Sequence, residues 1–214
     1  MRDFSVVEKR SVDEARRLRV IIIGAGISGI LACGQFRQRI PNLDICVYEK
    51  NAGIGGTWFE NRYLGCAYEI HQYWKHVADK YGCMEYTKLR QQIFEAVWDE
   101  EQSKWNLRIQ DLASSTTYID RCDVVVQATG ALNNWKWPNI PGLQEFKGTL
   151  MHSASWNQSY DYKGKRVAVV GNGSSGIQIV PALLPEVPHI DYYTRGRTWI
   201  SPSFRREQIE KRGQ

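Results

Sequence analysis

Glycines recur in this chain at the spacing that a phosphate-binding loop requires. Gly24, Gly26 and Gly29 form the pattern G-x-G-x-x-G within the stretch VIIIGAGISGILA. The first glycine of such a pattern permits a tight turn, the second lets the backbone approach a pyrophosphate, and the third lets a helix pack closely on a strand. Phosphates then lie at the helix start, where free N–H groups and the helix dipole favour negative charge. The pattern therefore predicts a dinucleotide-binding loop that includes Ile27 and Ser28.

The residues around this loop complete a dinucleotide-binding unit. We expect a strand at 20–23, a helix at about 29–40 and a second strand at 44–49, which ends in Glu49. An acid at this position accepts hydrogen bonds from ribose hydroxyls of an adenosine. The alternative is a glycine turn selected only for packing.

The same pattern returns later in the chain. A strand is expected at 166–170, a helix at 177–184 and another strand at 190–195. The loop residues that would hold a second dinucleotide are Gly171, Gly173, Ser174, Ser175 and Gly176.

An arginine stands where the second unit would otherwise carry its acid. Arg195 ends the expected strand, and Arg197 follows closely. An acid would repel a ribose 2′-phosphate, whereas a guanidinium binds it through charge-assisted hydrogen bonds worth about 1.5–3 kcal/mol each. We therefore predict FAD at the first loop and NADP(H) at the second. The alternative is that both arginines are surface cations.

Between the loops, alternating apolar and polar residues predict a β-meander. Its strands are expected at 93–99, 105–111 and 116–120, with Trp105, Leu107 and Ile109 on one face. A buried strand within 122–130 then returns to the parallel sheet. It ends in three residues that we expect beside the first cofactor, namely Ala128, Thr129 and Gly130.

These elements predict an α/β protein with two Rossmann-like dinucleotide-binding domains and a meander inserted in the first. We place the FAD-binding domain at 1–140, a connection at 141–160 and part of the NADP-binding domain at 161–214. The turn-rich stretch NNWKWPNIPG marks the boundary.

Composition narrows the classes of partner. The 214 residues carry a net charge of +5, and their Lys and Arg are scattered among acids, which argues against a nucleic-acid partner. The most apolar run is too short to span a bilayer, and the charged N-terminus is no signal peptide. Five cysteines without a C-x-x-C pair, and His71 and His76 without partner ligands, predict a cytoplasmic chain with no metal site and no disulfide frame.

A further constellation lies between the two loops. Phe146, Gly148, His152 and Trp156 follow neither a helical nor a strand period. With these residues the chain, from Val20 on, resembles the class B flavoprotein monooxygenases, and within them the Baeyer–Villiger monooxygenases of fungal type. Their short fingerprint is F-x-G-x-x-x-H-x-x-x-W followed by Pro or Asp, and here Asn157 takes that last position.

The resemblance implies an activity and its partners. NADPH would reduce FAD, and the reduced flavin would use O₂ to oxygenate a small molecule, turning a ketone into an ester or lactone, in the setting of secondary metabolism. Oxygenation of nitrogen or sulfur is the alternative known in relatives. In the family the fingerprint segment couples the two domains, so His152 and Trp156 would serve a hinge.

A longer family fingerprint begins at Gly55, Gly56, Thr57 and Trp58, which the resemblance places along the flavin. Its Pro is here Leu64, and Glu69 stands where an Asp is expected, so Glu69 is the one candidate catalytic residue. Relatives carry a further segment at this point, so we expect an internal deletion near Ala67, and Glu69 is alternatively just the acid that opens the next helix.

That helix is expected within 70–82, with its inward face formed by Ile70, Tyr73, Trp74, Val77 and Tyr81. Family members are about twice as long, so we also expect truncation and two incomplete folds. An inactive remnant and an NADPH:flavin reductase or plain dinucleotide-binding module therefore stay open as alternatives. The residues specify neither the substrate nor an oligomeric state.

Overall fold

The computed structural model describes residues 14–197 and 199 and divides the chain into two compact units. The first unit runs to Arg62 and resumes from Ala67 to Ser155, and the second combines Tyr63–Cys66 with the chain from Trp156 on. The short excursion at Tyr63–Cys66 has no signal in the sequence. Compactness alone does not define a cofactor-binding domain, so the domain ranges given above remain predictions.

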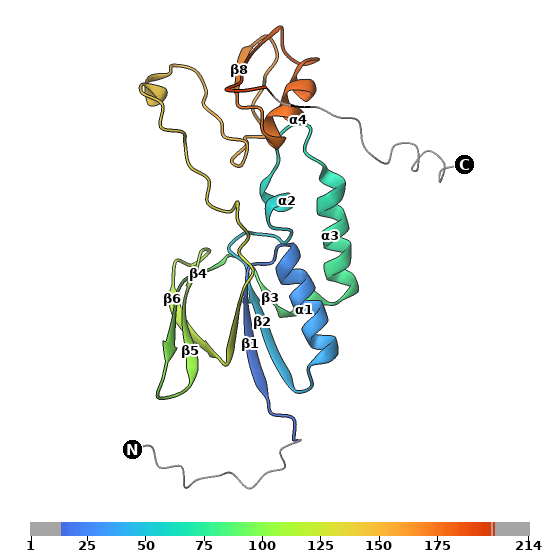
Figure 1. Cartoon of the computed structure of the whole chain (residues 1–214), viewed down its shortest axis with the longest axis vertical. Coiled ribbons are helices and arrows are strands. Elements are labelled where there is room, and N and C mark those ends of the chain that lie inside the picture. Colours follow the sequence, from blue (N-terminus) through green and yellow to red (C-terminus); the bar gives the residue numbers. More distant parts are fainter. Residues whose placement is uncertain (1–13, 198, 200–214) are drawn as a thin grey trace, which may run out of the picture. The chain divides into compact units, whose positions relative to one another are not determined.

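A parallel sheet organises the first unit, in the strand order β3-β2-β1-β7 (Figure 1). Its strands are β1 (Leu18–Ile23), β2 (Leu43–Tyr48), β3 (Thr87–Lys88) and β7 (Val124–Gln127). Helices α1 (Ile27–Arg39) and α3 (Tyr68–Lys80) lie side by side against it, with the short helices α2 (Thr57–Glu60) and η1 (Cys83–Tyr86) nearby (Figure 1). The expected strand–helix–strand unit is present.

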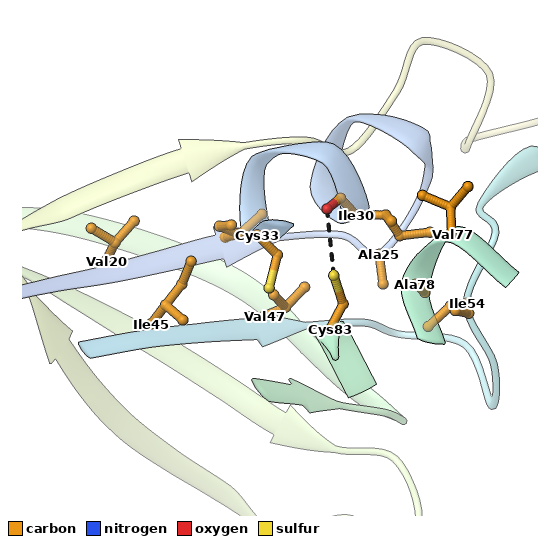
Figure 2. Packing of buried hydrophobic residues seen from close by; sticks show 11 residues of the cluster. Val20, Ala25, Ile30, Cys33, Ile45, Val47, Ile54, Val77, Ala78 and Cys83 are labelled. Atoms are coloured by element: carbon orange, nitrogen blue, oxygen red, sulfur yellow. Dashed lines mark hydrogen bonds between the residues drawn. The ribbon is translucent and has the colours of Figure 1, made fainter. Parts of the chain in front are cut away.

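Both faces of this sheet are covered, which explains why β1 is apolar throughout. Val20 and Ile22 point toward the helices and pack with a cluster that includes Ile30 and Cys33 of α1 (Figure 2). Ile21 points the other way and packs with Leu107 of the meander. Alternation along the strand therefore serves two cores at once.

The expected meander forms the second cover. Strands β4 (Gln91–Asp99), β5 (Lys104–Asp111) and β6 (Thr117–Cys122) pair antiparallel, with a bulge between Ile93 and Glu95. Leu107 and Ile109 are fully buried, as predicted. The chain then returns through β7, where Val20 lies opposite Val124 in a parallel pair.

A polar network fastens the meander to the sheet. Arg19 donates to Asp44 on the neighbouring strand at 2.8 Å and to Asp120 of β6 at 2.7 Å. The buried Tyr48 hydroxyl donates to Asp120 at 2.6 Å. Burial raises the pKa of Asp120, but the hydrogen bonds from Tyr48 and Arg19 outweigh it and hold that pKa below its usual value.

Helix α3 corrects one prediction. Trp74, Val77 and Tyr81 pack on the core, but Tyr73 is 59% exposed. Successive helical residues point about 100° apart, so a stripe that includes Trp74 and Val77 leaves Tyr73 at its border. The Tyr73 ring instead lies edge-on against Trp74.

The second unit is smaller. Strands β8 (Arg166–Val170) and β9 (His189–Tyr193) pair parallel, with Val167 opposite Ile190, and α4 (Ser174–Leu183) packs on them. The first unit also holds the one-turn helix η2 (Leu143–Glu145). Within residues 14–197 and 199, no helix is long and apolar enough to cross a membrane.

Replacing Asp120 by Asn should lower the free energy of unfolding by about 2 kcal/mol at pH 7, because a charged acceptor for two buried or half-buried donors is lost. A carboxyl whose folded-state pKa is depressed stabilises the fold above its unfolded pKa of about 3.9 and loses that contribution as pH falls through the folded value. The deficit measured by urea unfolding should therefore shrink toward zero near pH 3.

The matched control is Glu95→Gln on the same meander. Its pair with Arg108 is half exposed on both sides, so the change should stay within about 0.5 kcal/mol. An Asp120→Asn deficit of equal size at both pH values would contradict the network's role.

Candidate dinucleotide-binding sites

The first glycine loop turns sharply from β1 into α1. Gly24 follows the strand with φ +102° and donates its N–H to Tyr48 O at 2.7 Å. A Cβ at Gly24 would lie 2.7 Å from the carbonyl oxygen of Ala128, and a Cβ at Gly29 would overlap the carbonyl oxygen of Gly24. Neither position has room for a side chain, so strand end and helix start approach as closely as backbones can.

The start of α1 offers N–H groups and no competing charge. Gly26 is the N-cap residue, in an extended conformation with φ −75°. Within the described residues, no side chain caps this helix and its first turn holds no acid. The N–H groups of Ile27 and Ser28 are thus among those that a helix leaves without backbone partners. An anion is the ligand that this terminus favours.

Glu49 lies beside the loop, and its carboxylate holds the backbone. The residue is 3% exposed; one oxygen accepts the Ala25 N–H at 2.7 Å and the other accepts the Asn51 N–H at 2.8 Å. Each carboxylate oxygen can accept a second hydrogen bond. Sequence reasoning assigned these oxygens to a ribose and missed their role in shaping the loop.

The double-glycine turn reaches the same loop from the other side. Gly55 (φ +117°) donates its N–H to Ala25 O at 2.9 Å, and a Cβ at Gly56 (φ +55°) would lie 2.9 Å from the Gly26 Cα. Thr57 and Trp58 then open α2, both half-buried. The two glycine motifs therefore depend on each other for their close approach.

Two side-chain contacts that the sequence did not reveal fix this turn. His71 of α3 donates Nε2–H to Ile54 O at 3.0 Å. Lys50 bridges Glu60 of α2 and the carbonyl oxygen of Asn133, each at 3.2 Å. Neither contact has a local pattern, because each joins residues whose separation in the chain carries no periodicity.

The segment after β7 completes the first site. Ala128 donates its N–H to Ile23 O at 2.9 Å, and Thr129 O accepts from the Asn133 amide at 2.6 Å. Gly130 follows with φ +72°. The structure thus brings three predicted segments, the glycine loop, the double-glycine turn and Ala128–Gly130, to one end of the sheet.

The second glycine loop repeats the geometry of the first within its own unit. Gly171 has φ +106°, its N–H donates to Tyr193 O at 2.8 Å, and a Cβ at Gly176 would overlap the Gly171 carbonyl oxygen. Gly173 is the N-cap residue of α4 in an extended conformation, with Ser174 and Ser175 in the first turn. Again, the described residues supply no capping side chain and no acid in that turn.

The arginines lie where the loop can reach them. β9 ends at Tyr193, two residues before the predicted end, so Arg195 and Arg197 are on the exposed turn that follows. The Asn172 amide of the glycine loop donates to Gly196 O at 2.9 Å. This bond ties the arginine-bearing turn to the second glycine loop.

The four fingerprint residues pack in two places. The Phe146 ring covers Gly148, where a Cβ would lie 2.5 Å from the ring. His152 stacks on Trp135 with ring centroids 4.5 Å apart, and its Nδ1 accepts the Ala154 N–H at 3.1 Å. Burial lowers the pKa of His152, so the ring is neutral near pH 7 and serves packing.

Trp156, four residues later, belongs to the second unit. It packs near Tyr63 and Tyr162 within that unit's core cluster. The fingerprint therefore crosses the boundary between the units after Ser155.

Glu69 is exposed in the first turn of α3, where a carboxylate favours the helix dipole. The five cysteines are free thiols, and burial raises the pKa of Cys33 to about 12. Among the described residues, no three His, Cys, Asp or Glu side chains gather as a metal site.

Comparisons with known proteins agree with this arrangement. The profile of the flavin-binding monooxygenase-like family matches residues 60–207, and that of an NAD(P)-binding Rossmann-like domain matches residues 22–85. The FAD-binding monooxygenase tazF of Aspergillus terreus is 37% identical over 216 residues, covering 88% of this chain and 38% of the relative. A Baeyer-Villiger monooxygenase of Pseudomonas aeruginosa is 37% identical over 213 residues, covering 88% and 39%.

A solved structure shows the same fold. Cyclohexanone monooxygenase from Rhodococcus sp. Phi1, bound to NADP+, superposes with a TM-score of 0.77 at 28% identity, over 91% of this chain and 42% of that one. The chain spans about two fifths of the length of the curated relatives it matches.

The glycine positions differ sharply in what they tolerate. Gly29→Ala should destabilise the first unit by more than about 3 kcal/mol, because its Cβ overlaps a backbone carbonyl that cannot move without breaking the loop. Gly26→Ala meets its nearest atom, the Gly56 Cα, at 3.5 Å and should cost about 1 kcal/mol or less from the weaker N-cap. Thermal unfolding followed by circular dichroism measures both, and equal stability losses would contradict the close approach.

Proposed function

The chain belongs to the flavin-binding monooxygenase-like family, and from this premise we propose that it binds FAD at the first glycine loop and NADP(H) at the second. The enzyme of which these are parts inserts one atom of O₂ into a small organic substrate. The carrying observation is that two loops of the same geometry are followed by residues of opposite charge, Glu49 and Arg195.

The first loop fits a flavin dinucleotide in shape and charge. A pyrophosphate needs close backbone approach at Gly26 and free N–H groups at the start of α1. Both are present, and the first turn carries no acid. In this proposal Glu49 accepts the ribose hydroxyls with the capacity left after its two backbone bonds, while the double-glycine turn and Ala128–Gly130 line the rest.

The second loop fits a phosphorylated nicotinamide dinucleotide. A Cβ at Gly173 meets nothing within 4 Å, so open space faces the start of α4. Arg195 and Arg197 are exposed on a turn that Asn172 ties to the loop. A guanidinium there meets a 2′-phosphate, which NAD lacks.

The chemistry belongs to the bound groups: NADPH supplies a hydride, and reduced flavin activates O₂. This chain's residues bind and orient. Helix starts hold the phosphates, and Glu49 and Arg195 select between the two dinucleotides. We assign no proton transfer to Glu69, because its exposed place in the first turn of α3 is that of an acid opening a helix.

The finer activity is proposed from the relatives. Two of them are named for Baeyer-Villiger oxygenation, so we propose a ketone as the substrate and an ester or lactone as the product. The setting in secondary metabolism rests on the resemblance to fungal members. An inactive remnant would bind neither cofactor, and a plain reductase would consume NADPH with an artificial acceptor but give no oxygenated product.

Two alanine substitutions test the loops separately. Gly26→Ala should weaken FAD binding at least about tenfold and leave NADP+ binding unchanged, and Gly173→Ala should do the reverse, because each Cβ blocks the approach of one pyrophosphate. Both glycines have φ near −75°, which alanine adopts. Titration calorimetry measures the dissociation constants, with Gly196→Ala as the control; loss of both ligands from either variant would contradict the assignment.

Arg195→Ala should raise the dissociation constant for NADP+ by roughly tenfold or more, since about 1.5–3 kcal/mol of charge-assisted bonding is lost, and leave that for NAD+ unchanged. Lys163→Ala, in the turn before β8, removes one positive charge from the same unit and should change neither. Equal weakening of both nucleotides by Arg195→Ala would mean that the arginine is a general cation.

A further inference from the structure

A four-residue excursion of the chain, Tyr63–Cys66, packs as part of the second unit although both flanking segments belong to the first. Tyr63 is 6% exposed, and its hydroxyl donates to the side-chain oxygen of Gln178 on α4 at 2.9 Å. Tyr63 also joins the apolar cluster of Ile179 and Leu183. We call Tyr63–Cys66 the clip.

Gly65 brings the clip against the backbone of α4. Its φ is +81°, a conformation that favours glycine, and a Cβ there would lie 2.6 Å from the carbonyl oxygen of Gln178. Hydrogen bond, apolar packing and backbone contact thus all act on the same stretch of the helix. This is the helix whose first turn carries the second glycine loop.

The other end of the clip is tied to the first site. Only Asn61 and Arg62 separate Tyr63 from α2, which the double-glycine turn opens. Three Cα–Cα steps span at most about 11 Å, so a shift of α2 is passed to the clip within that reach. Gly55 in turn bonds to Ala25 of the first glycine loop.

The fingerprint segment meets the clip. Trp156, the first residue after the chain enters the second unit again, lies edge-on to the Tyr63 ring with centroids 6.5 Å apart. Both crossings of the chain therefore end in one aromatic contact beneath α4.

Building on the proposed function, we propose that Tyr63 is a positioning residue that couples the two cofactor sites: FAD at the first loop fixes the double-glycine turn and α2, the clip passes this to α4, and NADP(H) then binds more tightly. Coupling of this kind is reciprocal, so NADP+ must tighten FAD by the same factor.

The test compares dissociation constants with and without the other cofactor. In the unaltered chain, saturating FAD should lower the dissociation constant of NADP+ at least about fivefold, and NADP+ should do the same for FAD. Tyr63→Phe keeps the ring but removes the hydroxyl, and should cut this factor by about threefold or more. FAD binding measured alone should not change.

Tyr118→Phe is the matched control. Its hydroxyl also donates to a glutamine side-chain oxygen at 2.9 Å, that of Gln91, but within the meander, so the coupling should stay at the unaltered value. Gln178→Met removes the same bond from the exposed α4 side and should reproduce Tyr63→Phe, which keeps the test decisive if the buried variant does not fold. The double variant should add nothing to either single change.

The outcomes separate this inference from the proposed function. Binding of both cofactors with no mutual tightening, or tightening that Tyr63→Phe and Gln178→Met leave intact, overturns the role of the clip alone. An equal loss of coupling in Tyr118→Phe overturns it as well. Failure of the unaltered chain to bind either cofactor overturns the proposed function and this inference with it.

Discussion

The structure depends on one backbone contact made twice. In each glycine loop, the carbonyl oxygen of the first glycine lies where a Cβ of the third would be, at Gly24 with Gly29 and at Gly171 with Gly176. This contact sets the helix start directly beyond the strand end. The helix dipole and its unpaired N–H groups are then directed at one point, and their charge preference follows from geometry alone.

What surrounds that contact differs between the two units and gives each its character. In the first, a buried carboxylate accepts backbone N–H groups on both sides of the loop, so Glu49 shapes the site as well as offering it negative charge. In the second, a neutral amide, Asn172, ties the loop to a turn that carries two exposed guanidinium groups. The same backbone frame is thus tuned to opposite ligand charge by a few side chains.

Sequence reasoning succeeded where one local rule decides the outcome. The glycine spacing, the apolar run of β1 and the alternation at Leu107 and Ile109 each have a single physical solution, and the structure has all of them. It could not find the clip, because Tyr63 and Gln178 are joined by a contact over more than a hundred residues with no period. Tyr73 shows the same limit within a helix, since the border of an apolar stripe is set by its neighbours and not by its own pattern.

The thiols of the first core have a practical consequence. Cys33 and Cys83 are sealed between α1 and η1, and Cys83 donates to the Ile30 carbonyl oxygen (Figure 2). Burial raises the pKa of both, so neither supplies the thiolate that alkylating reagents attack. Their rate of labelling therefore reports how often the core beneath the first loop opens, which makes these native residues a built-in clock for local breathing.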